Sequence, residues 1–135
     1  MPLDPSSFIA DPDLILALDL HATPVDCPTE RLLFQQGEAP AGLYILKSGT
    51  ATLTMLSSAG TPLATTLATA GSLLGLPGVV GDKPYTLSAL AHSGAQISYL
   101  SRADFVRHMK SNPAIAFKIL AILAAEVRSA RQAML

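Results

Sequence analysis

The chain has 135 residues, of which half are hydrophobic and 14% are charged, so it can bury the core of a single domain without disulfides or metals. Its formal net charge of −1 provides no basic field for phosphates, and we expect no direct nucleic-acid binding. The only cysteine, Cys27, excludes an intrachain disulfide and a cysteine-based metal cluster, and the simplest location is the reducing cytoplasm.

The N-terminal segment is rich in acids and prolines and does not have the pattern of a signal peptide. Within it, Asp11-Pro12-Asp13 predicts the start of a short apolar helix through Leu14–Leu18. The most apolar stretch of the chain, Ala114–Val127, is interrupted by Lys118 and Glu126 and is too short to span a bilayer. We therefore expect no membrane association.

The middle of the chain, about residues 31–100, has a β pattern. Glycines recur there at intervals of roughly ten residues, the spacing of a jelly roll or barrel. Along one run, Ala51, Leu53 and Met55 alternate with Thr52 and Thr54, which predicts a strand with one buried face. The runs that we expect to form strands are Arg31–Gln36, Leu43–Lys47, Thr50–Leu56, Leu63–Leu67, Thr86–Ala91 and Gln96–Leu100.

After residue 100 the apolar period becomes helical. Ser101 and Asp104 have capping-box spacing, which predicts a helix over about 101–110. Asn112-Pro113 then predicts the start of a long helix over 113–134. Glu126, Arg128 and Arg131 on this helix are interpreted as a solvated polar face. Six residues have the 4-3-4-3-4 spacing of a coiled-coil seam: Ala116, Leu120, Leu123, Val127, Ala130 and Met134.

A second apolar stripe, formed by Ile115, Ile119 and Ile122, lies beside this seam. We expect one stripe to pack on the β-roll and the other to form a homodimer, because the combined surface is too wide for one short roll to cover. The alternative is a single wide face that is buried within a monomer.

The motif Gly37-Glu38, the strand Leu43-Tyr44-Ile45-Leu46 and the following Gly49 resemble the entry motif of cyclic-nucleotide-binding domains in the CRP/FNR superfamily. The resemblance covers about residues 10–135. It implies one domain over 1–135, mainly β: a jelly-roll β-barrel (a double-stranded β-helix) with a short N-terminal helix and a long C-terminal dimerisation helix.

The resemblance also implies a phosphate-binding cassette at Gly71 to Thr86, where the family uses backbone amides, an acid for the ribose and an arginine for the phosphate. Here Leu76 takes the place of the acid and Tyr85 that of the arginine. A buried phosphate without its charged partner loses about 2–5 kcal/mol of binding free energy, so we expect no useful binding of cAMP or cGMP. The candidate ligand residues are Gly71, Gly75, Leu76, Gly78, Tyr85 and Thr86.

Two interpretations of this altered pocket stay open. In one, Leu76 and Tyr85 fill the pocket and the domain is a structural dimerisation module. In the other, the pocket binds a less charged ligand that Thr86 and the Tyr85 hydroxyl orient, as family members that sense haem or organic acids imply. The protein is then a regulatory sensor that signals through its dimer helix to an unknown partner, alone or as part of a transcription regulator whose helix-turn-helix domain lies outside this chain.

Other chemistry finds little support in the sequence. His21, His92 and His108 are far apart and lack the spacing of a cupin metal site, so we expect no metal. Haem bound by His92 or His21 is a minor alternative, and no other cofactor is expected. No serine lies in a nucleophile-elbow motif. With no catalytic constellation, we expect that the protein is not an enzyme.

Overall fold

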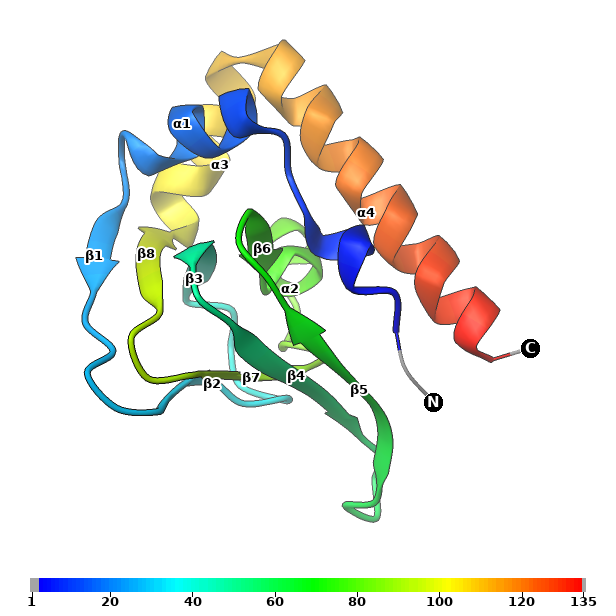
Figure 1. The fold of residues 1–135 in the computed structure, drawn as a ribbon. Coiled ribbons are helices and arrows are strands. Elements are labelled where there is room, and N and C mark those ends of the chain that lie inside the picture. Colours follow the sequence, from blue (N-terminus) through cyan, green and yellow to red (C-terminus); the bar gives the residue numbers. More distant parts are fainter. Residues whose placement is uncertain (1–2, 135) are drawn as a thin grey trace.

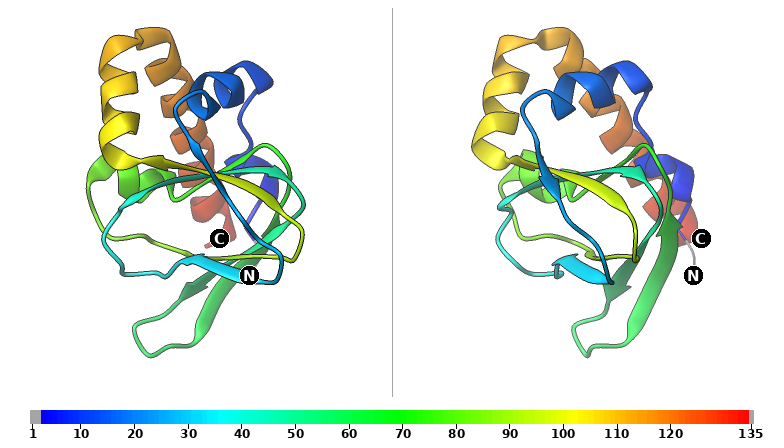
Figure 2. Two further views of the ribbon diagram at one scale, coloured as in Figure 1. Left: turned by 90° about the vertical axis from the view of Figure 1, so that its left-hand side faces the viewer. Right: turned by 60° about the vertical axis from the view of Figure 1, so that its left-hand side comes forward.

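A computed structural model describes residues 3–134. Two antiparallel four-stranded sheets form a β-roll, with strand orders β1-β8-β3-β6 and β2-β7-β4-β5, and helices cover one end and one side of it (Figures 1 and 2). The predicted jelly-roll fold is therefore confirmed. The strands are β1 (Thr23–Val25), β2 (Arg31–Phe34), β3 (Gly42–Ser48), β4 (Ala51–Leu56), β5 (Pro62–Ala68), β6 (Ser72–Leu74), β7 (Ser88–Ala91) and β8 (Gln96–Ser101).

The predicted alternation is present in β4. Ala51 and Leu53 are buried, whereas Thr52 and Thr54 on the opposite face are half-buried. Each fully buried leucine or isoleucine stabilises the fold by about 1.5–3 kcal/mol relative to an exposed one. The core between the sheets is therefore the main source of stability, and it fixes the strands that carry the site.

The roll begins earlier in the chain than the predicted residue 31. Strand β1 pairs with β8, with Thr23 opposite Tyr99. Its three residues include Pro24, which is tolerated because β1 is an edge strand. Strand β6 was not predicted either, since its three residues are all buried and show no alternation. Strand β7 begins at Ser88 rather than at Thr86.

Capping side chains define where the longer helices begin. Asp11 accepts a hydrogen bond from the Leu14 N–H at 2.8 Å, and Ser101 accepts one from the Asp104 N–H at 3.2 Å. Asn112 accepts one from the N–H of Ile115 at 3.3 Å. These contacts confirm the predicted starts. The helices are η1 (Pro5–Phe8), α1 (Pro12–Asp19), α2 (Leu76–Gly81), α3 (Arg102–Ser111) and α4 (Pro113–Ala133). None within residues 3–134 is long and apolar enough to cross a membrane.

The two apolar stripes of α4 have different environments. The stripe of Ile115, Ile119 and Ile122 is buried, whereas Leu120 and Val127 of the other are 58% and 50% exposed. The remaining seam residues are half-buried or, for Met134, exposed: Ala116, Leu123, Ala130 and Met134. One stripe thus belongs to the core of the chain, whereas Leu120, Val127 and Met134 of the seam are exposed. The homodimer itself stays a prediction.

Candidate functional site

The predicted cassette consists of β6, α2 and the loop that follows. Gly75, the N-cap residue that precedes α2, has a left-handed backbone conformation with φ of 92°, and a Cβ there would lie 2.8 Å from the ring of Tyr85. A Cβ on Gly78 would lie 2.9 Å from the carbonyl oxygen of Lys83. Glycine at both positions therefore allows the loop around Tyr85 to pack directly against α2.

Tyr85 is a core residue. Its hydroxyl donates a hydrogen bond to the carbonyl of Gly42 at 2.6 Å and accepts one from the Gly42 N–H at 3.1 Å. Its ring stacks on Phe34 with centroids 4.0 Å apart. Burial raises the pKa of this hydroxyl. Both hydrogen-bonding functions of the hydroxyl are used by the start of β3, so Tyr85 anchors the loop and does not present its hydroxyl to a ligand.

The other candidate ligand residues divide between scaffold and surface. Leu76 is fully buried. Gly71 connects three segments through its backbone, because its N–H binds the Leu46 carbonyl and its carbonyl accepts from the N–H of Ala10. Thr86 is exposed and borders a cavity. Thr86 is the only one of the six candidates that belongs to the lining of this cavity, as far as residues 3–134 are concerned.

This cavity, with a volume of about 150 Å³, lies between the cassette loop, the roll, the N-terminal segment and α4. Its lining is mostly apolar, and Glu126 is the one ionisable residue among the lining residues that the structure describes. No lysine or arginine is among them. The lining residues are Leu3, Phe8, Met55, Pro77, Thr86, Leu87, Glu126, Val127, Ser129 and Ala130.

Glu126 was missed as a site residue, and the prediction that it belongs to a solvated face is wrong. Its Oε2 atom is buried and has no hydrogen-bond partner among residues 3–134. Burial raises the pKa of its carboxyl to about 8. The signal in the sequence was its position four residues after Ile122 and seven after Ile119, which places it on the buried stripe of α4.

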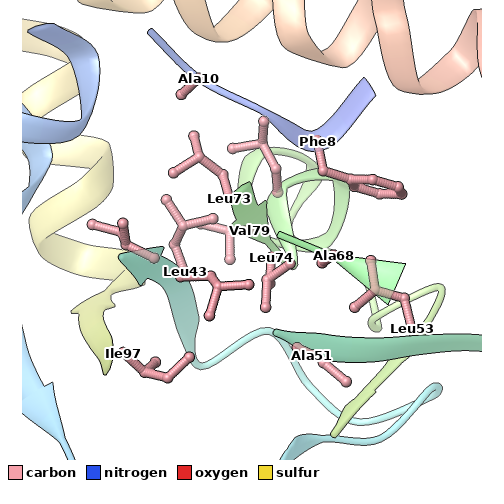
Figure 3. Packing of buried hydrophobic residues seen from close by; sticks show 14 of the residues in the cluster. Phe8, Ala10, Leu43, Ala51, Leu53, Ala68, Leu73, Leu74, Val79 and Ile97 are labelled. Atoms are coloured by element: carbon pink, nitrogen blue, oxygen red, sulfur yellow. The ribbon is translucent and has the colours of Figure 1, made fainter. Parts of the chain in front are cut away.

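The N-terminal segment forms another wall of the cavity. Leu3 and Phe8 are buried, and the backbone N–H of Asp4 donates to the Oγ of Ser129 on α4 at 2.8 Å. Figure 3 shows Phe8 and Ala10 of this segment above the core side chains of Leu73 and Leu74, with α4 passing beyond them. Residues from both ends of the chain therefore line the cavity.

Two of the three histidines lie closer together than the sequence predicted. The rings of His21 and His108 lie with centroids 5.2 Å apart, so these two residues are not far apart. His92 uses both ring nitrogens, which lie 2.8 Å and 2.7 Å from the hydroxyls of Thr50 and Thr52. In the described part of the chain, no three His, Cys, Asp or Glu side chains are grouped so that they could hold a metal ion. The haem alternative is untested.

Comparison with protein families gives a match to the Cyclic nucleotide-binding domain over residues 24–112, which extend from β1 to the end of α3. The chain belongs to this family. Members of the cyclic nucleotide-binding domain family are regulatory ligand-binding domains. Comparison with curated protein sequences gives no significant match.

Solved structures of the CRP/FNR superfamily share the fold of this cyclic nucleotide-binding domain, which confirms the resemblance seen in the sequence. The catabolite activator protein of Thermus thermophilus aligns with a TM-score of 0.78 and 24% identity, over 97% of this chain and 62% of that chain. The sensor domain of the transcriptional regulator DNR from Pseudomonas aeruginosa aligns with a TM-score of 0.67 and 21% identity, over 90% and 82% of the two chains. The present chain therefore spans less than two thirds of the Thermus protein.

A third relative is the c-di-GMP responsive global regulator CLP from Xanthomonas campestris. It aligns with a TM-score of 0.73 and 16% identity, over 90% of this chain and 62% of that chain. At these identities the likeness establishes the fold of the domain.

Proposed function

We propose that this domain is a regulatory sensor that recognises a small ligand other than cAMP or cGMP and signals through α4. The observation that carries the proposal is the composition of the cavity between the cassette loop and α4. Its one ionisable lining residue in the described chain is the acid Glu126, and no cation lines it. This arrangement is opposite to what a cyclic phosphate requires.

The missing cation determines how much affinity for a cyclic phosphate is lost. A phosphate in this cavity would meet a carboxyl and have no cationic partner, at a cost of about 2–5 kcal/mol. Each 1.4 kcal/mol lowers affinity by about a factor of ten. Arg102 does not supply the charge, because its Nε donates to the carbonyl of Val79 at 2.9 Å and lies 3.6 Å from the carboxylate of Asp82. It is engaged at the end of α2.

The volume of the cavity also disfavours a nucleotide. At about 150 Å³ it is smaller than the roughly 300 Å³ at which pockets for drug-sized ligands begin. Pro77 further removes one backbone donor from the first turn of α2. A smaller and uncharged or cationic ligand fits the lining better.

Signalling through α4 follows from its two faces. Glu126 and Ser129 line the cavity, and Val127 and Ala130 line it while also belonging to the seam. A ligand that changes the position of this turn would shift the population of helix arrangements. We propose that the seam pairs two copies of the chain to form a homodimer. We further propose that the protein acts in the cytoplasm and has no enzymatic activity.

A ligand-free structural module is the second candidate. The burial of Leu76 and the two hydrogen bonds between Tyr85 and Gly42 favour it, because they fill the part of the cassette that holds a nucleotide in the family. In either case the domain could be the sensor part of a transcription regulator, as the solved relatives include transcriptional regulators.

Two measurements test the proposal. Isothermal titration calorimetry with cAMP and cGMP is expected to show no binding below the millimolar range, and a submicromolar dissociation constant for either would refute the charge argument. Native mass spectrometry of the protein purified from its own host is expected to show a dimer that carries a small molecule. A bare dimer would favour the structural module.

A further inference from the structure

We propose that the cavity beside Glu126 binds a small, largely apolar primary amine, whose ammonium group pairs with the Glu126 carboxylate. This inference rests on the proposed sensor function and specifies its ligand class. It is drawn from the shape of the cavity, from the unpartnered carboxyl and from the charges around it.

The shape of the cavity sets the size of the ligand. Its volume is about 150 Å³, and apolar cavities of about this volume accept benzene-sized molecules. Phe8, Met55 and Leu87 contribute apolar walls. A ligand with one ring or a short alkyl chain would bury its hydrocarbon part here and gain the hydrophobic free energy of transfer from water.

The unpartnered carboxyl sets the functional group. The Oε2 atom of Glu126 is buried and lacks a hydrogen-bond partner in the part of the chain that the structure describes. A buried acceptor of this kind is costly and gains from any donor, and a buried carboxylate gains most from a cation. A neutral alcohol can hydrogen-bond to this carboxyl but forms no ion pair with it, and an anionic ligand would leave it protonated and find no cationic partner among the described lining residues.

Among residues 3–134, the elements around the cavity place no cation in its lining. From the cassette loop and the roll, the lining residues are Pro77, Thr86, Leu87 and Met55, none of which is ionisable. From the N-terminal segment, the charged residue beside this part of α4 is Asp4, whose carboxylate is used to accept hydrogen bonds from Ser6. No cation from these lining positions is available to pair with Glu126.

Binding of an amine has a distinctive proton balance. Burial raises the pKa of Glu126 to about 8, so at pH 7 the free carboxyl holds a proton. An alkyl amine at pH 7 arrives as an ammonium ion, as a lysine side chain would. Formation of the ion pair therefore releases the carboxyl proton to the buffer, while the ammonium keeps its own. About one proton is released per ligand bound at pH 7.

The test uses benzylamine and its neutral analogue benzyl alcohol. Each is titrated into the full chain at pH 7 by isothermal titration calorimetry in phosphate and in Tris, whose ionisation enthalpies differ. Benzylamine is expected to bind more tightly than benzyl alcohol by about tenfold or more. The apparent binding enthalpy of benzylamine is expected to differ between the two buffers by about the difference in their ionisation enthalpies, because about one proton is released per ligand. The apparent binding enthalpy of benzyl alcohol is expected to be the same in both buffers.

Two variants locate the site. Glu126→Gln keeps the size of the side chain and is expected to weaken benzylamine binding by about tenfold or more and to abolish proton release. Ala130→Leu leaves the carboxyl in place but fills the cavity, and is expected to abolish binding of both compounds. Circular dichroism confirms that both variants are folded.

The inference is overturned if benzylamine fails to bind at 10 mM (roughly −3 kcal/mol on the affinity scale), if it binds without proton release, or if either folded variant binds it as the native chain does. Such a result leaves the proposed sensor function standing where native mass spectrometry shows a bound molecule of another class. The proposed sensor function is refuted by different results: tight binding of cAMP or cGMP, or native mass spectra in which the purified protein carries no small molecule.

Discussion

The Oγ of Ser129 on α4 accepts a hydrogen bond from the backbone N–H of Asp4 at 2.8 Å, which joins two positions 125 residues apart in the sequence. Ser129 is buried and Asp4 is exposed, so this bond is partly shielded from water. A second contact, the ion pair between Asp11 and Lys118 at 2.9 Å, connects the start of α1 to an earlier turn of α4. The N-terminal segment is thereby fixed to the helix that we propose as the output of the domain.

Replacement of Ser129 by alanine tests this connection. The Asp4 N–H would lose its acceptor in a partly buried position, which costs about 1–3 kcal/mol. We expect faster hydrogen exchange of the Asp4 amide and a lower free energy of unfolding, measured by NMR exchange and by urea denaturation. Ser6→Ala is the control, because it removes an exposed hydroxyl contact to the Asp4 side chain and leaves the Ser129 bond intact. Unchanged exchange at Asp4 in the Ser129 variant would contradict the role of this bond.

Tyr85→Phe tests whether Tyr85 is a structural anchor. The variant keeps the stacking on Phe34 but leaves the N–H and carbonyl of Gly42 without the hydroxyl that bonds both. We expect a loss of about 1–3 kcal/mol in the free energy of unfolding. Tyr99→Phe is the matched control, since it removes a single hydrogen bond to the Ala41 carbonyl at an exposed position and should cost less. Equal losses in the two variants would argue against the anchor.

The parts of the fold that depend on short-range chemistry were predictable. Asp11, Ser101 and Asn112 each cap a helix through a residue three positions ahead, and such spacing is visible in any sequence. The alternation in β4 likewise depends only on which face of one strand is buried.

What the sequence did not reveal depends on contacts between distant segments. The hydroxyl of Tyr85 is used by Gly42, 43 residues away, so its role in the core could not be inferred from the cassette alone. The Oε2 atom of Glu126 is buried, and Leu3 and Phe8 from the other end of the chain line the same cavity. The place of Glu126 on the isoleucine stripe was visible in the sequence. It was nevertheless predicted to be solvated, because an acid on a helix ordinarily is.

Leu120→Glu tests the proposed dimer. Leu120 is 58% exposed and lies on the seam, so a charge there should not unfold the chain but should disfavour a buried pairing of two α4 helices. We expect the mass in solution, measured by light scattering, to fall to that of one chain. Ala121→Glu is the control, because it places the same charge at an exposed position of α4 away from the seam. An unchanged mass in the Leu120 variant, or equal dissociation in the control, would count against the seam.

The pH dependence of stability provides a direct measure of the burial of Glu126. Its pKa is raised from 4.5 to about 8 in the folded chain. Between these two pH values the unfolded chain has released the proton while the folded chain retains it. The unfolded state therefore binds fewer protons, and the free energy of unfolding falls as the pH rises through this window.

Glu126→Gln removes this dependence because the amide does not titrate. At pH 5 the variant and the native chain should differ little, whereas at pH 8 the variant should be more stable by about 2–4 kcal/mol, as each unit of pKa shift corresponds to about 1.4 kcal/mol. Urea denaturation at pH 5, 6, 7 and 8 measures the difference. Glu30→Gln, at an exposed position, controls for the loss of one carboxyl. If the difference between the Glu126 variant and the native chain did not grow with pH, Glu126 would be solvated in the folded protein.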